Sequence, residues 1–279
     1  MDIKHLVQKV FYINMNESTI RNEQSIENLN KLGLPIERID AVTPKNYIEH
    51  KYLGFDDTNF EDIPKRNLEK FGKSIYRVYT KRNPRWRGDI CCGLSHVKAI
   101  LEAKKQGYKR VMICEDDFIF LDNESELFMN NIHKIPPIFD ILHITSLMHS
   151  NFKSAFKDSS LVNYSVDGHF LNDFVFKIEK GLLGTGAYII NLENEALIKE
   201  YTSILIDGGI SDCLLSFRLQ AKYLCYTTRY KLGYQDYLQP TTIARTKGID
   251  FSINNPRIKW LMKCTFNTPW TIDKYKNEI

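Results

Sequence analysis

Residues 111–120 read VMICEDDFIF and place three adjacent carboxylates, Glu115, Asp116 and Asp117, between two apolar stretches. The first stretch is apolar throughout instead of alternating, which is typical of a parallel strand buried on both faces. In open α/β sheets, ligands bind at the carboxyl ends of such strands. Closely spaced carboxylates at that edge can hold a hard divalent cation against phosphate oxygens. We therefore expect Glu115 and Asp117 to bind Mn²⁺ or Mg²⁺, with Asp116 beside them in the same site.

Acidic triplets also have an ordinary explanation. The chain contains 34 Asp and Glu residues, so some triplets fall at strand ends by chance and act as solubilising turns. The sequence around this segment is needed to choose between the two explanations.

The N-terminal part of the chain predicts a βαβ unit. Residues 10–14 form an apolar run, residues 18–32 have a helical pattern that ends at Gly33, and residues 36–42 return to a strand pattern. Such a unit predicts parallel strands joined by a right-handed crossover. The fold class we expect is therefore α/β, with a mostly parallel Rossmann-like sheet flanked by helices.

Later segments extend this pattern. Asp89 is expected to cap a helix that ends before Gly107 and leads directly into the strand before Glu115. Further strands are predicted at residues 139–144 and 181–190, and a further helix at residues 193–202. Residues 43–87 are polar, irregular in pattern and longer than an ordinary connection, which favours a functional loop. The basic run in this segment could clamp a diphosphate, dock an acidic acceptor or contact nucleic acid, although a solvated loop is the ordinary explanation. It consists of Lys73, Arg77, Lys81, Arg82, Arg85 and Arg87.

Composition limits the class of protein. The 279 residues contain 43% hydrophobic and 26% charged residues, as ordinary globular proteins do. We expect one domain over residues 1–250, with residues 251–279 as an extension packed on it. The net charge of +4 is modest, so no nucleic-acid partner is indicated. The N-terminal stretch suggests neither a signal peptide nor a membrane span, which predicts a cytoplasmic protein with at most peripheral membrane contact.

The six cysteines have neither CxxC pairs nor zinc-finger spacing. We expect them to be reduced and mainly structural. Cys92 and His96 do share a helix face, because they are four residues apart. Ser95 and His96 are candidates for contacts with donor or acceptor hydroxyls, although a single helical histidine is usually a structural residue.

Gly184, Thr185 and Gly186 come directly before a predicted strand. This position argues against a dinucleotide fingerprint and a P-loop, which lie between a strand and a helix. The glycines could allow the backbone to approach a sugar closely, or they could serve a tight turn that needs positive φ.

Taken in order, these features resemble glycosyltransferase family 25, which contains lipopolysaccharide β-galactosyltransferases and the collagen galactosyltransferase domain. The resemblance spans residues 8–245. It rests on the opening strand with Arg21 behind it, residues 88–96 ending in Ser-His, the Glu-Asp-Asp strand end, residues 184–188, and Asp212. The segment after the first strand departs from the family pattern, because Arg21 is its one arginine where the family usually has several.

The resemblance implies a GT-A fold, a UDP-sugar donor and inversion at the anomeric carbon. It also implies that Ala41 and Val42 contact the uracil and ribose, and that Arg21 supplies a basic contact to the donor. The acceptor would be a hydroxyl on a glycan, a lipid-linked glycan or a glycosylated protein, and galactose or glucose is the expected sugar.

An inverting transfer needs a carboxylate base that is separate from the metal ligands. Asp212 is the preferred candidate, because it follows two glycines and opens an apolar, helix-like run. Its ordinary role would be a helix N-cap, and Asp207 and Asp236 are competing candidates for the base.

Two other classes of function remain open. A sugar-phosphate nucleotidyltransferase also uses acidic strand ends and a metal, but it usually has a glycine-rich loop after its first strand, and residues 14–21 contain no glycine. A non-catalytic carbohydrate-binding domain could keep the fold without turnover, although three acids at one strand end argue against it.

Overall fold

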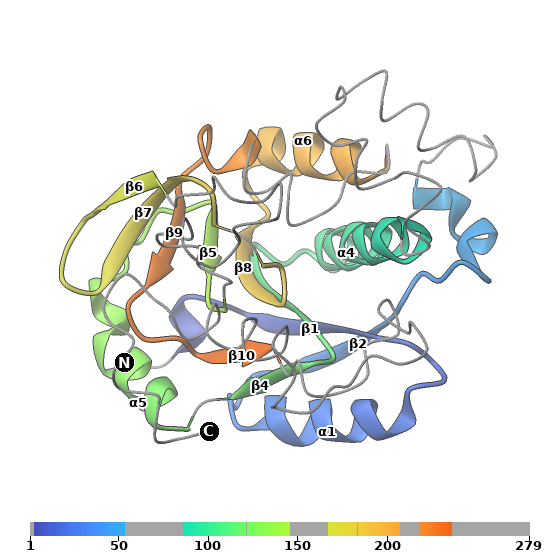
Figure 1. The fold of residues 1–279 in the computed structure, drawn as a ribbon, viewed down its shortest axis with the longest axis horizontal. Helices are drawn as coiled ribbons and strands as arrows, with labels where there is room; N and C mark the ends of the chain where they lie inside the picture. The colour runs from blue at the N-terminus through green and yellow to red at the C-terminus, as the bar shows by residue number, and fades with distance from the viewer. Residues whose placement is uncertain are drawn as a thin grey trace, which may run out of the picture.

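The computed structural model describes residues 3–53, 86–120, 122–145, 167–182, 184–206 and 218–235. Eight strands form one sheet, and a separate small sheet has two strands (Figure 1). In spatial order, the large sheet consists of β2 (Ile36–Asp40), β1 (Lys9–Asn14), β3 (Arg110–Glu115), β8 (Ala187–Asn191), β5 (Ile141–His143), β9 (Cys225–Thr228), β7 (Val175–Lys180) and β6 (Asp167–Phe170).

Strand direction confirms the predicted sheet and adds one feature. Strands β2, β1, β3, β5, β9 and β6 run in one direction, whereas β8 and β7 run in the other. The sheet is therefore mostly parallel, but its central strand β8 is antiparallel to both of its neighbours. An apolar run indicates that a strand is buried on both faces, but it does not determine whether the strand is parallel or antiparallel to each neighbour. The sequence pattern therefore could not reveal the direction of β8.

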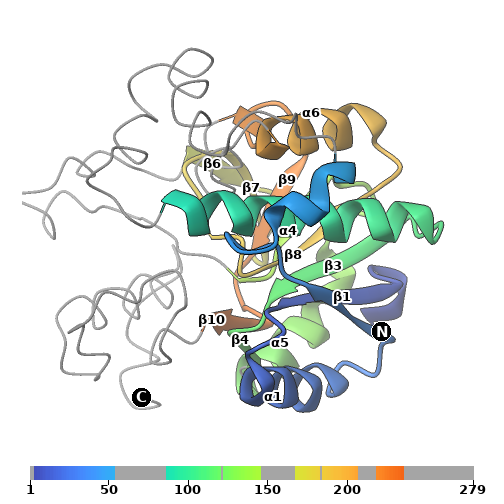
Figure 2. The same ribbon diagram turned by 90° about the vertical axis from the view of Figure 1, so that its right-hand side faces the viewer.

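Helices cover both faces of the sheet. Helices α4 (Trp86–Lys105) and α6 (Glu195–Ile206) lie on one face, and α1 (Thr19–Asn30) and α5 (Asp122–Asn131) lie on the other (Figures 1 and 2). The described residues also include three short 3₁₀ segments: η1 (Ile3–His5), η2 (Tyr47–Leu53) and η4 (Ile132–Lys134).

Strand β3 shows why an unbroken apolar run was informative. Val111 and Ile113 enter the core beneath α4 and α6, whereas Met112 and Cys114 enter the core beneath α1 and α5. All four side chains are fully buried. Both faces of the strand are therefore covered, and the chain can become polar only where β3 ends, at Glu115.

Helix α4 begins four residues earlier than predicted. It starts at Trp86, and Asp89 lies inside its first turn instead of capping it. A carboxylate in the first turn still stabilises the positive end of the helix dipole, so a sequence pattern does not distinguish the two positions. The helix ends as expected, with Lys104 and Lys105 in the last turn and Gly107 at φ 79°.

The small sheet lies beside the carboxyl end of β3. Its strands β4 (Phe118–Phe120) and β10 (Gly233–Gln235) are antiparallel. Pairing of Gln235 with Phe118 brings the amide of Gln235 next to the acidic triplet.

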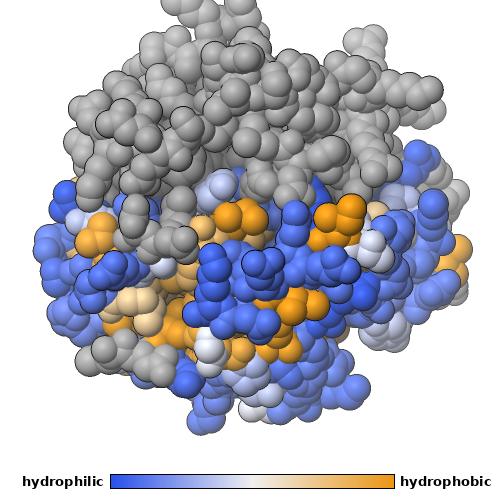
Figure 3. Space-filling model, turned by 90° about the horizontal axis from the view of Figure 1, so that it is seen from below, coloured by the Kyte–Doolittle hydropathy of each residue, from blue (hydrophilic) through white to orange (hydrophobic). Residues whose placement is uncertain are grey.

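The described surface seen from below in Figure 3 is mainly hydrophilic, with hydrophobic patches between the charged groups. Within the described residues, no helix has the length and apolar character needed to cross a membrane. The predicted boundary at residue 250 and the extension after it lie outside the described residues.

Candidate functional site

A cavity of about 370 Å³ lies where β1, β2 and β3 end. Its walls come from the end of β1 and the residues after it (13–15 and 17), residues 41–45 after β2, one face of α4, and Glu115 with Asp116. The carboxyl ends of parallel strands form this edge of the sheet, which is the expected ligand position in an open α/β fold. Five predicted site residues therefore line one cavity: Ala41, Val42, Ser95, Glu115 and Asp116.

Asp116 is held by the protein on both of its carboxylate oxygens. Arg21 Nη1 lies 2.8 Å from Oδ1, and Asn14 Nδ2 donates to Oδ2 at 2.8 Å. Burial raises the pKa of Asp116, and although Arg21 and Asn14 oppose this effect, the net pKa remains above its ordinary value. Arg21 and Asp116, both predicted to contact a donor, thus form an ion pair at the cavity wall.

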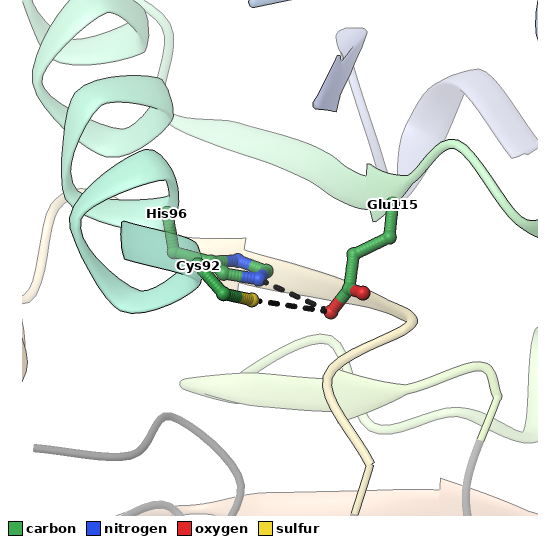
Figure 4. Close-up of side chains that lie close together, drawn as sticks. All are labelled: Cys92, His96 and Glu115. Atoms are coloured by element: carbon green, nitrogen blue, oxygen red, sulfur yellow. Dashed lines mark hydrogen bonds and ion pairs between the residues drawn. The ribbon is translucent and has the colours of Figure 1, made fainter. Parts of the chain in front are cut away.

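Three polar side chains lie close to one carboxylate oxygen of Glu115. Its Oε1 lies 3.8 Å from Cys92 Sγ, 3.5 Å from His96 Nε2 and 3.3 Å from Thr185 Oγ1. Figure 4 shows Cys92 and His96 reaching from α4 toward the end of β3. Burial raises the pKa of Glu115, but His96, Thr185 and Cys92 outweigh burial, so the net pKa is lowered. Glu115 is therefore ionised in this environment.

His96 lies behind the cavity and is completely buried. Its Nδ1 lies 3.0 Å from the hydroxyl of Tyr188, and the two rings are stacked with centroids 5.6 Å apart. Tyr201 in turn donates to the Tyr188 hydroxyl at 3.4 Å. Tyr188 is a core residue, as expected, and it also orients the histidine.

Asp117 has a different environment from Glu115. Gln235 Nε2 lies 3.5 Å from its Oδ1. Burial and the adjacent charges of Glu115 and Asp116 raise the pKa of Asp117 well above its ordinary value. Arg21 and Gln235 oppose this shift only in part, and an acid in such surroundings is stabilised by a proton or by a cation.

Ser95 connects α4 to the segment after β2. The backbone N–H of Val42 donates to Ser95 Oγ at 2.8 Å, and Ser95 Oγ donates to the carbonyl of Cys91 at 2.8 Å. Ser95 therefore shapes the cavity wall formed by Ala41 and Val42.

The two glycines around Thr185 meet backbone and packing requirements. Gly184 has φ 108°, a conformation that favours glycine. A Cβ on Gly186 would lie 2.2 Å from the side chain of Gln235, so this glycine makes room for the residue that contacts Asp117. These observations support the turn explanation for Gly184. Close approach to a sugar stays a prediction.

Sequence reasoning missed part of the site. Asn14 and Lys45 line the cavity, but nothing in their local patterns distinguishes them from other polar residues. Arg87 belongs to the basic run that could clamp a diphosphate, and it lines the same cavity. Cys92 was treated as structural, although its shared helix face with His96 was the available signal. Of the described residues, Cys92, His96 and Glu115 form the group of three metal-ligating side chains whose ligand atoms lie within 4.8 Å of one another.

Several predicted residues fall outside the described part of the chain. These are Asp212, its competitors Asp207 and Asp236, and the basic residues between 73 and 85. Their roles stay predictions.

A second polar group is buried at the same edge of the sheet. Lys231 is 5% exposed, and its ammonium contacts Thr227 Oγ1 and the carbonyl of Thr228. Burial lowers the pKa of Lys231 to about 7, although Glu124 partly opposes this shift. Burial and the charge of Lys231 also lower the pKa of His143 to about 3.

Comparison with known proteins places the chain in a family. A family model described as glycosyltransferase family 25 (LPS biosynthesis protein) matches residues 7–207. No curated protein sequence matches the chain significantly. A solved structure titled "The crystal structure of apo- UDP-glucose pyrophosphorylase" is similar over 81% of this chain and 91% of that chain, with 12% identity and a TM-score of 0.40. This likeness is too distant to bear on activity.

Proposed function

The chain belongs to glycosyltransferase family 25 and is a glycosyltransferase, and we propose that it is an inverting, metal-dependent enzyme of the GT-A type. The donor is a UDP-hexose, with galactose or glucose as the sugar. The acceptor is a hydroxyl on a glycan, a lipid-linked glycan or a glycosylated protein.

The cavity at the carboxyl ends of β1, β2 and β3 is the observation that carries this proposal. Its volume of about 370 Å³ falls within the range of small-molecule sites. Ile13 and Val42 offer apolar surface for a nucleobase, and Lys45 and Arg87 contribute positive charge for a diphosphate. Glu115 supplies the acidic side of the same cavity.

The acidic residues fit a divalent cation. Asp117 is partly buried beside two other acids and has a raised pKa, whereas the ion pair of Arg21 is with the neighbouring Asp116. Glu115 and Asp117 would hold Mn²⁺ or Mg²⁺. When bound, such a cation stabilises negative charge on the leaving diphosphate.

The remaining chemistry belongs to side chains of the protein. Asp212 accepts the proton of the acceptor hydroxyl as the oxygen forms its bond to the anomeric carbon and the bond to the diphosphate breaks. The Arg21–Asp116 pair and Ser95 hold the walls of the cavity in place. Thr185 orients the Glu115 carboxylate through its hydroxyl.

A panel of nucleotide sugars tests the reaction class. Each donor is incubated with Mn²⁺ or with EDTA, in the presence of water or of glycan acceptors, and the released nucleotide is measured. We expect UDP release from one UDP-hexose, dependent on metal and increased by acceptor. Release of pyrophosphate from a nucleoside triphosphate would instead identify a nucleotidyltransferase, and absence of any turnover would support a binding domain.

The Asp212→Asn variant tests the assignment of the base. Asparagine caps a helix nearly as well as aspartate, but it cannot accept the proton. We expect turnover to fall by roughly two to four orders of magnitude, while the melting temperature and UDP affinity stay nearly unchanged. Retained turnover would transfer the role to another carboxylate, with Asp207→Asn and Asp236→Asn as the next variants.

A further inference from the structure

We propose that Cys92, His96 and Glu115 form a binding site for a borderline transition-metal ion such as Zn²⁺. Cys92 and Glu115 line the cavity, and His96 lies behind them. Three protein ligands would therefore hold the ion, and its fourth position would face the cavity. Sites with three protein ligands and one open position are typical of zinc that binds an exchangeable ligand.

The distances between the ligand atoms suit a tetrahedral ion. With Zn–S near 2.3 Å and Zn–N or Zn–O near 2.0–2.1 Å, neighbouring ligand atoms lie about 3.3–3.6 Å apart. In this protein, His96 Nε2 and Cys92 Sγ lie 3.5 Å and 3.8 Å from Glu115 Oε1. The third pair, His96 Nε2 and Cys92 Sγ, lies within 4.8 Å, so side-chain shifts of at most about 1 Å would complete the geometry.

The histidine gives a second, independent indication. His96 Nε2 is buried and makes no hydrogen bond with any described residue. Its 3.5 Å approach to Glu115 is close enough for an ion pair but lies outside hydrogen-bond geometry. A buried polar atom without a hydrogen bond is costly, and a bound cation would use its lone pair.

The surroundings of His96 match the outer shell of known metal sites. A metal-binding histidine usually donates its second ring N–H to a neighbouring acceptor, which sets the tautomer and the ring orientation. Tyr188 is placed for this role, 3.0 Å from Nδ1. Tyr201 supports Tyr188 from the other side.

The mixture of donor atoms decides the class of metal. A thiolate and an imidazole select Zn²⁺ and similar ions, whereas Mg²⁺ prefers oxygen ligands. The inference needs neither nucleotide nor sugar, so it goes beyond the proposed function. The Zn²⁺ site also differs from the Mn²⁺ or Mg²⁺ site proposed above, in which Glu115 and Asp117 would hold the ion through oxygen atoms alone.

Cobalt substitution provides the direct test. The purified full-length protein is titrated with Co²⁺, and charge-transfer absorption from a thiolate is recorded; Zn²⁺ is then added to displace the cobalt. We expect a thiolate band at one equivalent of Co²⁺ that disappears with Zn²⁺. Absence of the band would overturn the proposal and leave a thiol and a histidine that contact Glu115 without metal.

Two variants and one control assign the ligands. Cys92→Ala should abolish the band and weaken Zn²⁺ binding by on the order of 100-fold or more, since even outer-shell partners contribute 10–100-fold. Tyr188→Phe keeps the ring in the core and should weaken Zn²⁺ binding by roughly 10–100-fold. Cys91→Ala is the matched control, because Cys91 is the adjacent thiol and its burial raises the pKa to about 12.

Equal Zn²⁺ affinity in wild type and Cys92→Ala would refute the site. A similar loss in Cys91→Ala and Cys92→Ala would show a general disturbance of α4 and would also refute it. Because these titrations contain no nucleotide sugar, they can fail while the transferase proposal holds, and the reverse is equally true.

Discussion

The side chains of Arg21 and Asp116 are each only 13% exposed, and their charged groups lie 2.8 Å apart. The pair connects α1 to the turn after β3, and Ser25 adds a hydrogen bond from α1 to the backbone carbonyl of Asp116. At this depth, either charge alone would be costly. The pair therefore maintains the acidic turn in its position at the cavity.

Replacing Arg21 with alanine should destabilise the protein by about 3 kcal/mol, because it leaves the buried Asp116 carboxylate without its counter-charge. Urea unfolding of wild type and variant measures the change. Lys104→Ala is the control, because Lys104 pairs with Glu195 at the surface, where the exposures are 29% and 76%. That pair should contribute less than about 1 kcal/mol, and equal losses in the two variants would contradict the buried role of Arg21.

Strands β4 and β10 are short, and one glycine allows them to pair closely. A Cβ on Gly233 would lie 2.3 Å from the backbone carbonyl of Ile119. That oxygen belongs to the opposite strand and cannot move without separating the pair. Gly233 therefore determines whether Gln235 reaches Asp117.

The Gly233→Ala variant should lose roughly 2 kcal/mol of stability, the scale of an overpacked core position. Gly33→Asn is a suitable control, because Gly33 has φ 62° with open space around it and asparagine tolerates that conformation. Thermal unfolding of both variants would show the difference. A Gly233→Ala protein as stable as the control would mean that β4 and β10 do not pair as described.

At the level of helices and strands, the sequence predicted what depends on local pattern. Helix α1 and strand β2 lie within the predicted segments, β1 begins one residue before its predicted segment, and β8 follows the predicted glycines. The direction of β8 was not predicted, because it depends on the strands that lie beside it in space. The early start of α4 was not predicted, because Asp89 suits the helix dipole either as a cap or inside the first turn. The proximity of Cys92 to Glu115 was also not predicted, because it depends on the packing of α4 against β3.

At the scale of the whole molecule, Lys231 makes stability depend on pH. The unfolded chain binds a proton at this lysine up to its ordinary pKa of 10.5, whereas in the folded protein the pKa is about 7. Between these values the unfolded state holds more protons, so the free energy of unfolding rises as pH rises. Below pH 7 both states are protonated, and this dependence ends.

The Lys231→Met variant should remove that dependence. Between pH 7 and pH 8.5, wild type should gain about 1.6 kcal/mol relative to the variant. The slope reaches 1.36 kcal/mol for each pH unit only above pH 7, because about half of the lysine in the folded protein is still protonated at that pH. Urea unfolding at both pH values gives the comparison. Taking the difference between the two proteins cancels the opposing effect of buried thiols such as Cys225, whose pKa is raised by burial. Parallel pH profiles would show that Lys231 stays charged in the folded protein.

The position of β8 has a consequence for how the chain is made. Strand β8 is the link between the sheet segment β2-β1-β3 and the segment β5-β9-β7-β6, yet residues 187–191 are synthesised long after β3 and β5. Until they leave the ribosome, the inner edges of β3 and β5 have no partner, and unpaired strand edges promote association between chains. A nascent chain that stalls before residue 187 should therefore require a chaperone. Completion of β8 would join β3 to β5, and the later strand β9 would then cover the outer edge of β5.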